Sequence, residues 1–505
     1  MATTEPATVY DVLIIGGGIN GAGIARDAAG RGLRVCLVEQ DDLAAHTSSA
    51  STKLIHGGLR YLEHGELRLV RESLAERERL LAIAPHIVKP LRFVLPYVDG
   101  LRPRWLLRLG LFVYDHAGGR ERLAASAGTR LAGTALGEPL RAELTDGFEY
   151  SDCWVEDSRL VVLNAMDANE RGARIMTQTK VTHARAADGL WTASCEDRAT
   201  GRRFTLQART LVNATGAWVN HVLDMLDIEP RQQLRLVKGS HLVLRRQFAG
   251  EHAYLLQSPD RRVIFAIPFE QDYTLLGTTD VPFKGDPSQV TIDAGERDYL
   301  LTCLNRFFRR TVTAADIVTT YSGVRPLFDD GSGETAQQVS RDYHLELQED
   351  PTGAAVLTVY GGKITTYRRL AEAALSMLLR QLDHAEGGSW TAEETLPGGD
   401  FPAADLQLFT AHALQRWPGL PPVMITRLAR LYGTRMSQIL GNARLLEDLG
   451  ARFGNDLTFA EVSYLVESEW ARSASDILWR RTRLGLALPA SAVDQLQDAV
   501  TQLLR

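Results

Sequence analysis

Two histidines of this 505-residue chain lie among small residues and could act as general bases. His56 follows Leu54-Ile55 and precedes Gly57-Gly58, so backbone or a ligand can come close to its ring. His241 follows Lys238-Gly239-Ser240 and is the second candidate. Histidine suits this role because its unperturbed pKa of about 6.5 lies near neutral pH. A single histidine is more often structural than catalytic, and the sequence leaves open which of the two takes a proton.

Several basic side chains could anchor an anionic group such as a phosphate. Arg325 lies in Gly323-Val324-Arg325-Pro326, where small and rigid neighbours would hold it in place. A guanidinium group matches phosphate oxygens with its planar fork and does not lose its charge. The alternative for any single arginine is a surface charge in contact with water. Further candidates are Arg60 and Arg341, with Tyr61 as a hydroxyl donor.

The glycines that could hold a cofactor follow an apolar run at the start of the chain. Gly16, Gly18 and Gly21 have the G-x-G-x-x-G spacing of dinucleotide-binding folds. Gly16 permits a tight turn, Gly18 lets a pyrophosphate approach the backbone, and Gly21 allows a helix to pack closely on a strand. A second apolar run ends at Glu39, whose carboxylate can accept hydrogen bonds from ribose hydroxyls. Dinucleotide binding is therefore predicted in preference to a plain glycine-rich turn.

Two further strand-to-glycine junctions lie far downstream, at Gly216 and at Gly361-Gly362-Lys363. The fingerprint alone fits NAD or FAD, but an extended FAD needs contacts from several distant segments. Backbone N–H groups after Gly361 would open a helix, whose positive end could stabilise negative charge on a reduced flavin. Lys363 could add to this or contact a substrate phosphate. The polar segment 47–53 could line the flavin, and its alternative is a surface loop.

The order of these segments predicts an α/β protein in which a Rossmann-like domain is assembled from separated pieces. A β-rich segment is inserted between the pieces, and the tail has a helical pattern. The expected division is 1–90, 150–235 and 345–388 for cofactor binding, 91–149 and 236–344 for substrate binding, and 389–505 for a C-terminal helical cap.

Composition excludes several classes of protein. The net charge of −6 gives no basic bias, so nucleic acid is not expected as a partner. The four cysteines are scattered without C-x-x-C, which argues against a disulfide framework or structural zinc and fits a cytoplasmic setting. The sequence contains no H-E-x-x-H motif, so it does not indicate a metal site. No signal peptide is visible, and no run reaches the ~18 apolar residues of a membrane-spanning helix.

Long motifs across nearly the whole chain resemble those of the FAD-dependent, respiratory (aerobic) glycerol-3-phosphate dehydrogenases. They are IIGGGINGAG at 14–23, TSSASTKLIHGGLRYL at 47–62, LVKGSH at 236–241, GTTD at 277–280, YSGVRPL at 321–327, SRDY at 340–343, GGKITTYR at 361–368 and WRRT at 479–482. No EF-hand pattern follows the helical tail, so we expect the bacterial form rather than the calcium-regulated mitochondrial one.

This resemblance implies a fold similar to that of D-amino-acid and glycine oxidases, with FAD as cofactor. It implies oxidation of sn-glycerol 3-phosphate to dihydroxyacetone phosphate, with hydride transfer from C2 to FAD and electrons passed to a membrane quinone. It assigns substrate chemistry to His56, with His241 as the second candidate, and substrate binding to Arg60, Tyr61, Arg325, Arg341 and Lys363. The expected cofactor contacts are Gly16, Gly18, Gly21, Glu39, Ser48, Ser49, Lys53, Gly216, Gly361, Gly362, Ile364 and Thr365.

A quinone acceptor requires contact with a bilayer. Residues 101–114 mix leucines, aromatic residues and arginines, which suits a helix lying on an anionic lipid surface. The alternative is a buried helix whose arginines extend to solvent. We expect a cytoplasmic protein bound peripherally to the inner face of the cell membrane, and a homodimer is compatible with the sequence.

Three other functions are considered. The first is an oxygen-dependent glycerol-3-phosphate oxidase that produces hydrogen peroxide, because O₂ access depends on cavity shape rather than on a motif. The second is an amine or amino-acid oxidase of the same fold, which would show no preference for a phosphorylated substrate. The third is a flavin-binding protein without turnover, which the joint presence of His56, Arg325 and Lys363 disfavours.

Overall fold

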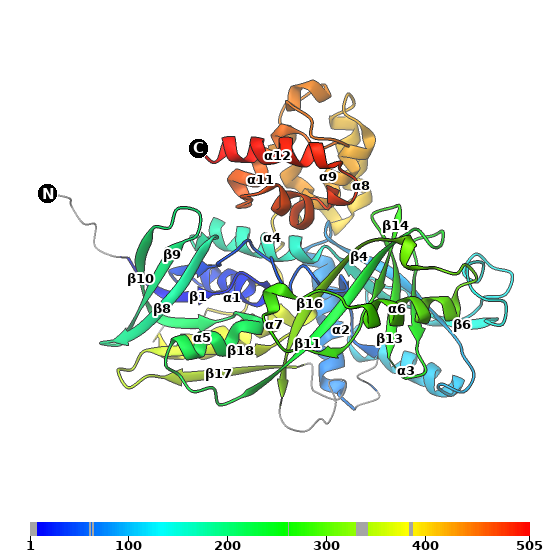
Figure 1. Cartoon of the computed structure of the whole chain (residues 1–505), viewed down its shortest axis with the longest axis horizontal. Helices are drawn as coiled ribbons and strands as arrows, with labels where there is room; N and C mark the ends of the chain where they lie inside the picture. Colours follow the sequence, from blue (N-terminus) through cyan, green and yellow to red (C-terminus); the bar gives the residue numbers. More distant parts are fainter. Residues whose placement is uncertain (1–7, 60–61, 63–64, 261, 330–341, 383–386) are drawn as a thin grey trace.

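The structure of the protein is a computed structural model that describes residues 8–59, 62, 65–260, 262–329, 342–382 and 387–505. Its broad body contains two β-sheets with helices packed against them, and a helical lobe rises from one side of this body (Figure 1). The lobe holds the C-terminal end of the chain, while the first strands and helix lie in the body.

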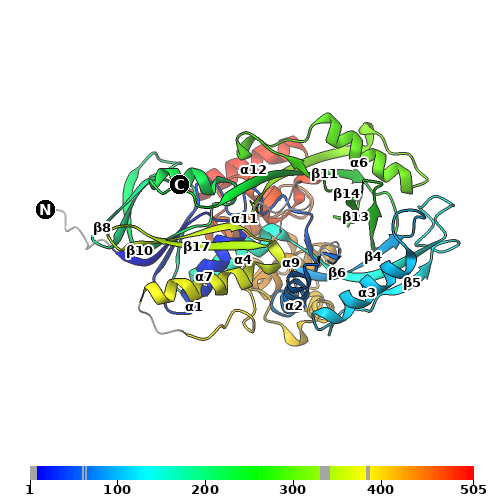
Figure 2. The same cartoon turned by 90° about the horizontal axis from the view of Figure 1, so that it is seen from below.

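The first sheet is built around the apolar strand β1 (Val9–Ile15), which pairs in parallel with β2 (Val35–Val38) and β10 (Arg203–Asn213). Helix α1 (Ile19–Gly30) covers this sheet together with α4 (Asp157–Glu170) and α7 (Tyr367–Gln381) (Figure 2). Strands buried on both faces must be apolar, and β2 is buried throughout. The other elements of this half are β7 (Arg174–Met176), β8 (Thr179–Ala187), β9 (Leu190–Asp197), β17 (Tyr343–Glu349), β18 (Ala355–Gly361) and α5 (Val219–Met225).

The second sheet forms the other half of the body and is mostly antiparallel. Its longest pairing joins β11 (Gln233–Arg245) to β16 (Ile317–Asp329). Both strands carry predicted site motifs. Their pairing places Lys238 opposite Val324, one residue before Arg325. The other elements here are β3 (Leu54–Ile55), β4 (Val88–Pro96), β5 (Ala127–Arg130), β6 (Asp146–Val155), β12 (Ala253–Gln257), β13 (Val263–Phe269), β14 (Tyr273–Gly277), β15 (Val281–Pro282), α2 (Leu67–Ile83), α3 (Arg104–Ala117) and α6 (Ala294–Phe307).

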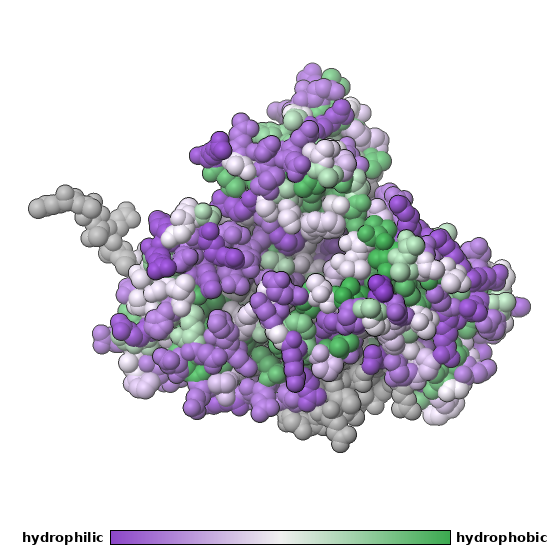
Figure 3. Space-filling view, viewed as in Figure 1, coloured by the Kyte–Doolittle hydropathy of each residue, from purple (hydrophilic) through white to green (hydrophobic). Residues whose placement is uncertain are grey.

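The C-terminal lobe, here called the cap, is helical as expected and is narrower than the body in the space-filling view (Figure 3). It comprises α8 (Leu406–Arg416), α9 (Pro422–Tyr432), α10 (Met436–Leu440), α11 (Phe459–Ser468), a π-helix at Asp476–Arg481 and α12 (Ala490–Leu503). Buried side chains of the cap belong to the same apolar cluster as those of α1 and α4. The cap and the half of the body built on the first sheet therefore share one continuous core.

The predicted domain limits stay a prediction, and four of them fall inside strands. The limits at 90, 149, 235 and 344 lie within β4, β6, β11 and β17, respectively. Of the helices within the described ranges, none combines the length and the apolar character that a membrane-spanning segment needs.

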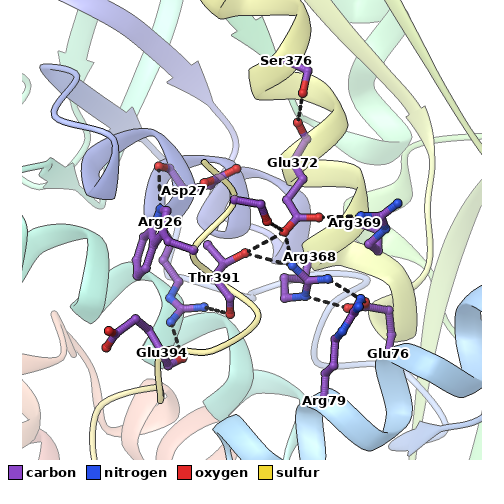
Figure 4. A network of polar contacts seen from close by, with 12 residues as sticks. Arg26, Asp27, Glu76, Arg79, Arg368, Arg369, Glu372, Ser376, Thr391 and Glu394 are labelled. Carbon is purple, nitrogen blue, oxygen red and sulfur yellow. Dashed lines mark hydrogen bonds and ion pairs between the residues drawn. The ribbon is translucent and has the colours of Figure 1, made fainter. Parts of the chain in front are cut away.

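A buried ion network ties α7 to α2 and to the start of the cap segment (Figure 4). Arg368 belongs to the GGKITTYR motif and is buried; its guanidinium donates to both carboxylate oxygens of Glu76, at 2.8 and 2.6 Å. It also contacts Glu372 and donates to Thr391 Oγ1 at 3.1 Å. The arginine thus joins three segments that are far apart in the sequence.

Replacing Arg368 by methionine is expected to lower the free energy of unfolding by about 3 to 5 kcal/mol, because Glu76 would stay buried without its main counter-charge. The neighbouring Arg369, which also pairs with Glu372 but is 48% exposed, provides the control. Its methionine variant is expected to cost less than about 1 kcal/mol. Denaturant unfolding of the two variants measures the difference, and equal losses would contradict this role for Arg368.

Candidate active site

A cavity of about 1020 Å³ is lined by residues from both sheets. Among the predicted residues, those that line it come from five separate parts of the chain, which the fold brings together. They are Gly16, Gly18, Glu39, Ser48, His56, Gly216, Arg325, Gly361, Gly362, Lys363, Ile364 and Thr365. Arg60, Tyr61 and Arg341 lie outside the described residues, so the structure says nothing of their positions.

The fingerprint forms the turn that its glycines predict. Gly16 has φ +112°, and a Cβ there would lie 2.7 Å from the carbonyl oxygen of Ala214. A Cβ on Gly21 would lie 2.0 Å from the carbonyl oxygen of Gly16, so any side chain would force α1 away from β1. Gly21 therefore serves packing and does not line the cavity. Because Gly18 has no side chain, the N-terminus of α1 stays open, and such a helix N-terminus can bind the anionic pyrophosphate.

Glu39 stands at the end of β2, as predicted, and its carboxylate already accepts backbone hydrogen bonds. Oε2 accepts from the Gly17 N–H at 2.7 Å, and Oε1 accepts from the Asp41 N–H at 2.8 Å. Burial raises the pKa of this carboxyl, while these backbone donors lower it. Each oxygen keeps a second lone pair that can accept a ribose hydroxyl.

The third strand-to-glycine junction lies directly beside the first. Gly361 ends β18 and Gly362 follows it, both with positive φ angles, and the chain then forms a 3₁₀ turn at Ile364–Thr366 and enters α7. Asn20 Nδ2 from α1 donates to the Gly361 carbonyl oxygen at 3.1 Å. A Cβ on Gly362 would lie 2.9 Å from that Asn20 nitrogen. Two helices therefore begin next to one another at the cavity, which suits an extended, negatively charged cofactor.

His56 lines the cavity in the second half of the body. Its backbone N–H donates to Thr365 Oγ1 at 3.3 Å, and its ring centroid lies 6.5 Å from that of Phe265. Burial lowers its pKa to about 4, and the positive charges of Lys363 and Arg77 add to this effect. The imidazole is therefore neutral at pH 7 and able to accept a proton.

A hydrogen-bonded group that the sequence reasoning missed holds the segment of His56. The Gly57 N–H donates to Tyr114 Oη at 2.7 Å, and that hydroxyl lies 2.7 Å from Asp152 Oδ1. Arg77 Nη1 donates to the same Asp152 oxygen at 2.8 Å. These residues come from α3, β6 and α2, and no local motif marks them. The apolar pattern of 101–114 was the signal nearest to Tyr114, but it does not reveal this contact.

Arg325 lies at the cavity with the GTTD motif packed around it. Its Nη1 donates to Asp280 Oδ1 at 2.7 Å, and its Nη2 donates to Thr278 Oγ1 at 3.0 Å. The guanidinium remains 28% exposed and lines the cavity, as does Lys363. Two cations and a neutral histidine therefore face one cavity. The cations can bind a small anion, and the imidazole can accept a proton from it.

Three predicted site residues lie behind the cavity wall instead of lining it. His241 is fully buried, its Nε2 lies 3.0 Å from Thr52 Oγ1, and its ring stacks on Tyr321 at 4.7 Å. Burial, with the charges of Arg325 and Lys53, holds its pKa well below the ordinary value. Lys53 turns away from the cavity because Asp157 accepts from its Nζ at 2.9 Å. Ser49 Oγ instead donates to the His46 carbonyl oxygen at 3.2 Å.

Within the described ranges, no group of three or more histidine, cysteine, aspartate or glutamate side chains is placed to hold a metal ion. The four cysteines are buried and form no disulfide.

Comparisons with known proteins match most of the chain. Residues 11–368 match the family of FAD-dependent oxidoreductases, and residues 389–505 match the C-terminal domain of alpha-glycerophosphate oxidase. A glycerol-3-phosphate dehydrogenase of Pseudomonas aeruginosa is 51% identical over 96% of this chain and 94% of that protein. The D-erythritol 1-phosphate dehydrogenase of Brucella abortus is 49% identical over 95% of each chain.

A solved structure shows the same architecture with the cofactor present. The glycerol-3-phosphate dehydrogenase of Bacillus halodurans in complex with FAD superimposes with a TM-score of 0.76 at 28% identity, covering 98% of this chain and 90% of that one. The predicted fold class is thereby confirmed. With the glycine turns and helix N-termini of the cavity, these matches show that the chain belongs to the FAD-dependent oxidoreductases of the glycerol-3-phosphate dehydrogenase family and uses FAD as its cofactor.

Proposed function

We propose that this protein oxidises sn-glycerol 3-phosphate to dihydroxyacetone phosphate. The observation that carries the proposal is the presence of His56, Arg325 and Lys363 on one cavity with the cofactor-binding glycines. FAD, when bound, supplies the acceptor for the hydride that leaves C2. The names of the relatives agree with this substrate but include a second phosphorylated polyol, D-erythritol 1-phosphate.

The side chains divide the work in a simple way. Arg325 and Lys363 bind the phosphate of the substrate through charge-assisted hydrogen bonds. The neutral imidazole of His56 accepts the proton of the C2 hydroxyl, so that the hydrogen on C2 leaves as hydride and a carbonyl group forms. The Tyr114 hydroxyl, itself bonded to the Asp152 carboxylate, holds the Gly57 backbone and so supports the backbone position of His56.

An anaerobic absorbance spectrum tests cofactor and substrate together. Adding glycerol 3-phosphate to the purified holoenzyme is expected to bleach the flavin band at lower concentrations than D-erythritol 1-phosphate, and glycerol without phosphate is expected to bleach it poorly. Preference for the erythritol phosphate would replace the proposed substrate. Failure of every phosphorylated polyol, with bleaching by an amino acid or amine, would contradict the proposed function.

We further propose that electrons pass to a membrane quinone rather than to oxygen. This proposal rests on α3, whose outer face exposes Trp105 (68%), Leu109 (52%) and Phe112 (55%), while Leu111 and Tyr114 are buried on its inner face. The helix lies on the side of the body away from the cap (Figure 1). Stoichiometric hydrogen peroxide during turnover, with no reduction of a ubiquinone analogue, would favour the oxidase alternative.

Replacing Trp105 and Phe112 together by serine is expected to abolish sedimentation with anionic liposomes at low salt, because an interfacial helix binds through its buried apolar area. The control replaces Leu408 and Val423, two exposed apolar residues of the cap, in the same way. Sedimentation assays compare both variants with the unchanged protein. Liposome binding that survives in the α3 variant, or is lost equally in the cap variant, would contradict this surface.

A further inference from the structure

One wall of the cavity is a loop, residues 40–53, here called the wall loop. It follows Glu39 and precedes β3 and His56, and most of its residues line the cavity. Its middle is held by the second sheet: Thr47 Oγ1 donates to the Val324 carbonyl oxygen at 2.8 Å, and Tyr321 Oη donates to the Ser51 carbonyl oxygen at 2.9 Å. The cap binds the first end directly, and it binds the second end through Asp157 of α4.

At the first end, Asp42 is bound by two successive arginines of the cap. Arg481 donates from both terminal nitrogens to the two oxygens of Asp42, at 2.9 and 2.8 Å. Arg480 Nε donates to Asp42 Oδ2 at 2.6 Å. Arg481 and Asp42 are both buried, at 1% and 3% exposure. A bidentate pair in this setting fixes orientation as well as distance.

At the second end, the carboxylate of Asp157 accepts hydrogen bonds from three side chains. Lys53 Nζ donates to it at 2.9 Å and Ser51 Oγ at 2.8 Å, both from the wall loop. Arg483 of the cap donates to the same group at 2.8 Å. Asp157, Lys53 and Arg483 are all buried. The cap therefore supplies the second cation on the carboxylate that holds the end of the loop.

The local geometry of the cap fits this task. The contacts come from one short stretch, the π-helix Asp476–Arg481 and the two residues after it. Arg483 has φ +60°, a left-handed conformation that is unfavourable for a residue with a side chain. In this conformation its Nε lies 2.7 Å from Glu156 Oε2 while its Nη2 reaches Asp157. Strain of this kind persists where the surroundings fix the residue, as this buried ion cluster does.

We propose that the cap is part of the cofactor site: Arg481 and Arg483 hold the two ends of the wall loop and thereby preorganise the wall against which FAD binds. They are positioning residues, because they act through Asp42, Asp157 and Lys53. The cap would then govern FAD affinity in addition to covering the core. This inference needs FAD as cofactor but not any particular substrate.

The test uses full-length Arg481→Gln and Arg483→Gln, with Arg435→Gln as a control for the loss of an ion pair between cap and body. Arg435 joins cap to body through Glu170 Oε2 at 2.7 Å, in a more exposed pair that involves no residue of the wall loop or of the cavity lining. FAD is titrated onto the deflavinated proteins and followed by its fluorescence. Arg481→Gln and Arg483→Gln are each expected to raise the Kd for FAD by about tenfold or more, whereas Arg435→Gln is expected to raise it by less than about twofold.

A second measurement separates positioning from general loss of structure. In FAD-free Arg481→Gln and Arg483→Gln, hydrogen exchange of peptides covering 40–53 is expected to accelerate, while peptides from β1 and β10 keep their protection. Arg483→Lys keeps the charge but not the fork, and its expected Kd lies between those of the unchanged protein and Arg483→Gln; it is the test variant if the glutamine variant is not recovered folded. Unchanged FAD affinity in both Arg481→Gln and Arg483→Gln, or an equal loss of FAD affinity in Arg435→Gln, would overturn the proposal.

Discussion

Replacing Arg325 by alanine is expected to lower kcat/KM for glycerol 3-phosphate by about two to three orders of magnitude, with FAD still bound. The guanidinium lines the cavity and is held in place by Asp280 and Thr278, so little ordering remains to be done when the phosphate arrives. Its removal leaves a dianionic phosphate with Lys363 as its remaining cation among the described cavity residues assigned to binding. Steady-state kinetics with a saturating artificial acceptor measures the change.

The control for this prediction is Arg310, a second arginine that pairs with an aspartate in the same half of the body. Arg310 Nη2 donates to Asp316 at 2.9 Å, but the side chain is 58% exposed and does not line the cavity. Its alanine variant is expected to keep kcat/KM within about twofold of the unchanged enzyme. Arg325→Lys should recover part of the loss, since it restores the charge without the fork.

Two further readouts define the role of Arg325. Oxidation of glycerol, which has no phosphate, should be slow in every variant and insensitive to this substitution. The flavin spectrum should not change, because Arg325 is assigned to the substrate and not to FAD. A variant that loses FAD, or one that oxidises glycerol 3-phosphate within about fivefold of the unchanged enzyme, would contradict phosphate binding by Arg325.

Local motifs predicted the strand-to-helix turns that line the cavity, for a physical reason. A strand that runs into glycines and then a helix fixes its own geometry within a few residues, so Gly16, Gly18 and Gly361 could be placed from the sequence. The helical cap was also recognisable from its periodicity. The strand pairing that brings β16 and β18 to the same cavity depends on long-range contacts, which the sequence pattern does not specify.

The direction of a long side chain was harder to predict than its place in the chain. Lys53 belongs to a polar motif beside the cofactor, yet its ammonium group turns to Asp157, 104 residues away. His241 follows two small residues as His56 precedes two, but its ring lies behind Thr52. Burial of a charged or polar group requires a partner, and in each case that partner came from a distant part of the chain.

Residues that support the site were invisible to motif reasoning. Tyr114 lies in a segment that the sequence marks as amphipathic, and its inward contact with Gly57 depends on how α3 packs against β6. Arg483 lies in a cap that has no cofactor motif of its own, although it reaches the end of the wall loop. Such residues become recognisable only once the elements are arranged in space.

Replacing His56 by asparagine is expected to slow anaerobic flavin bleaching by glycerol 3-phosphate by about two to four orders of magnitude, which is the range for loss of a general base. Asparagine keeps a polar side chain of similar size but cannot take the proton. His241→Asn separates the two candidates: its loss should be at least about tenfold smaller, because its ring does not line the cavity. Equal losses, or bleaching by the His56 variant within about tenfold of the unchanged enzyme, would contradict this assignment.

The pH dependence provides an independent check on the same residue. Neutral imidazole is the reactive form, and burial with the nearby charge of Lys363 lowers the pKa of His56 to about 4. The acid limb of kcat/KM that belongs to the enzyme should therefore fall near pH 4, well below the ordinary histidine range. Lys363→Met removes one positive charge and should move this limb to higher pH, although it also weakens substrate binding. The ionisation of the substrate phosphate is common to all variants and cancels in their ratio. Once the ionisation of the substrate phosphate, whose second pKa is about 6, has been divided out, an enzyme limb near pH 6.5, or one that does not move in Lys363→Met, would show that the proton goes to a different group.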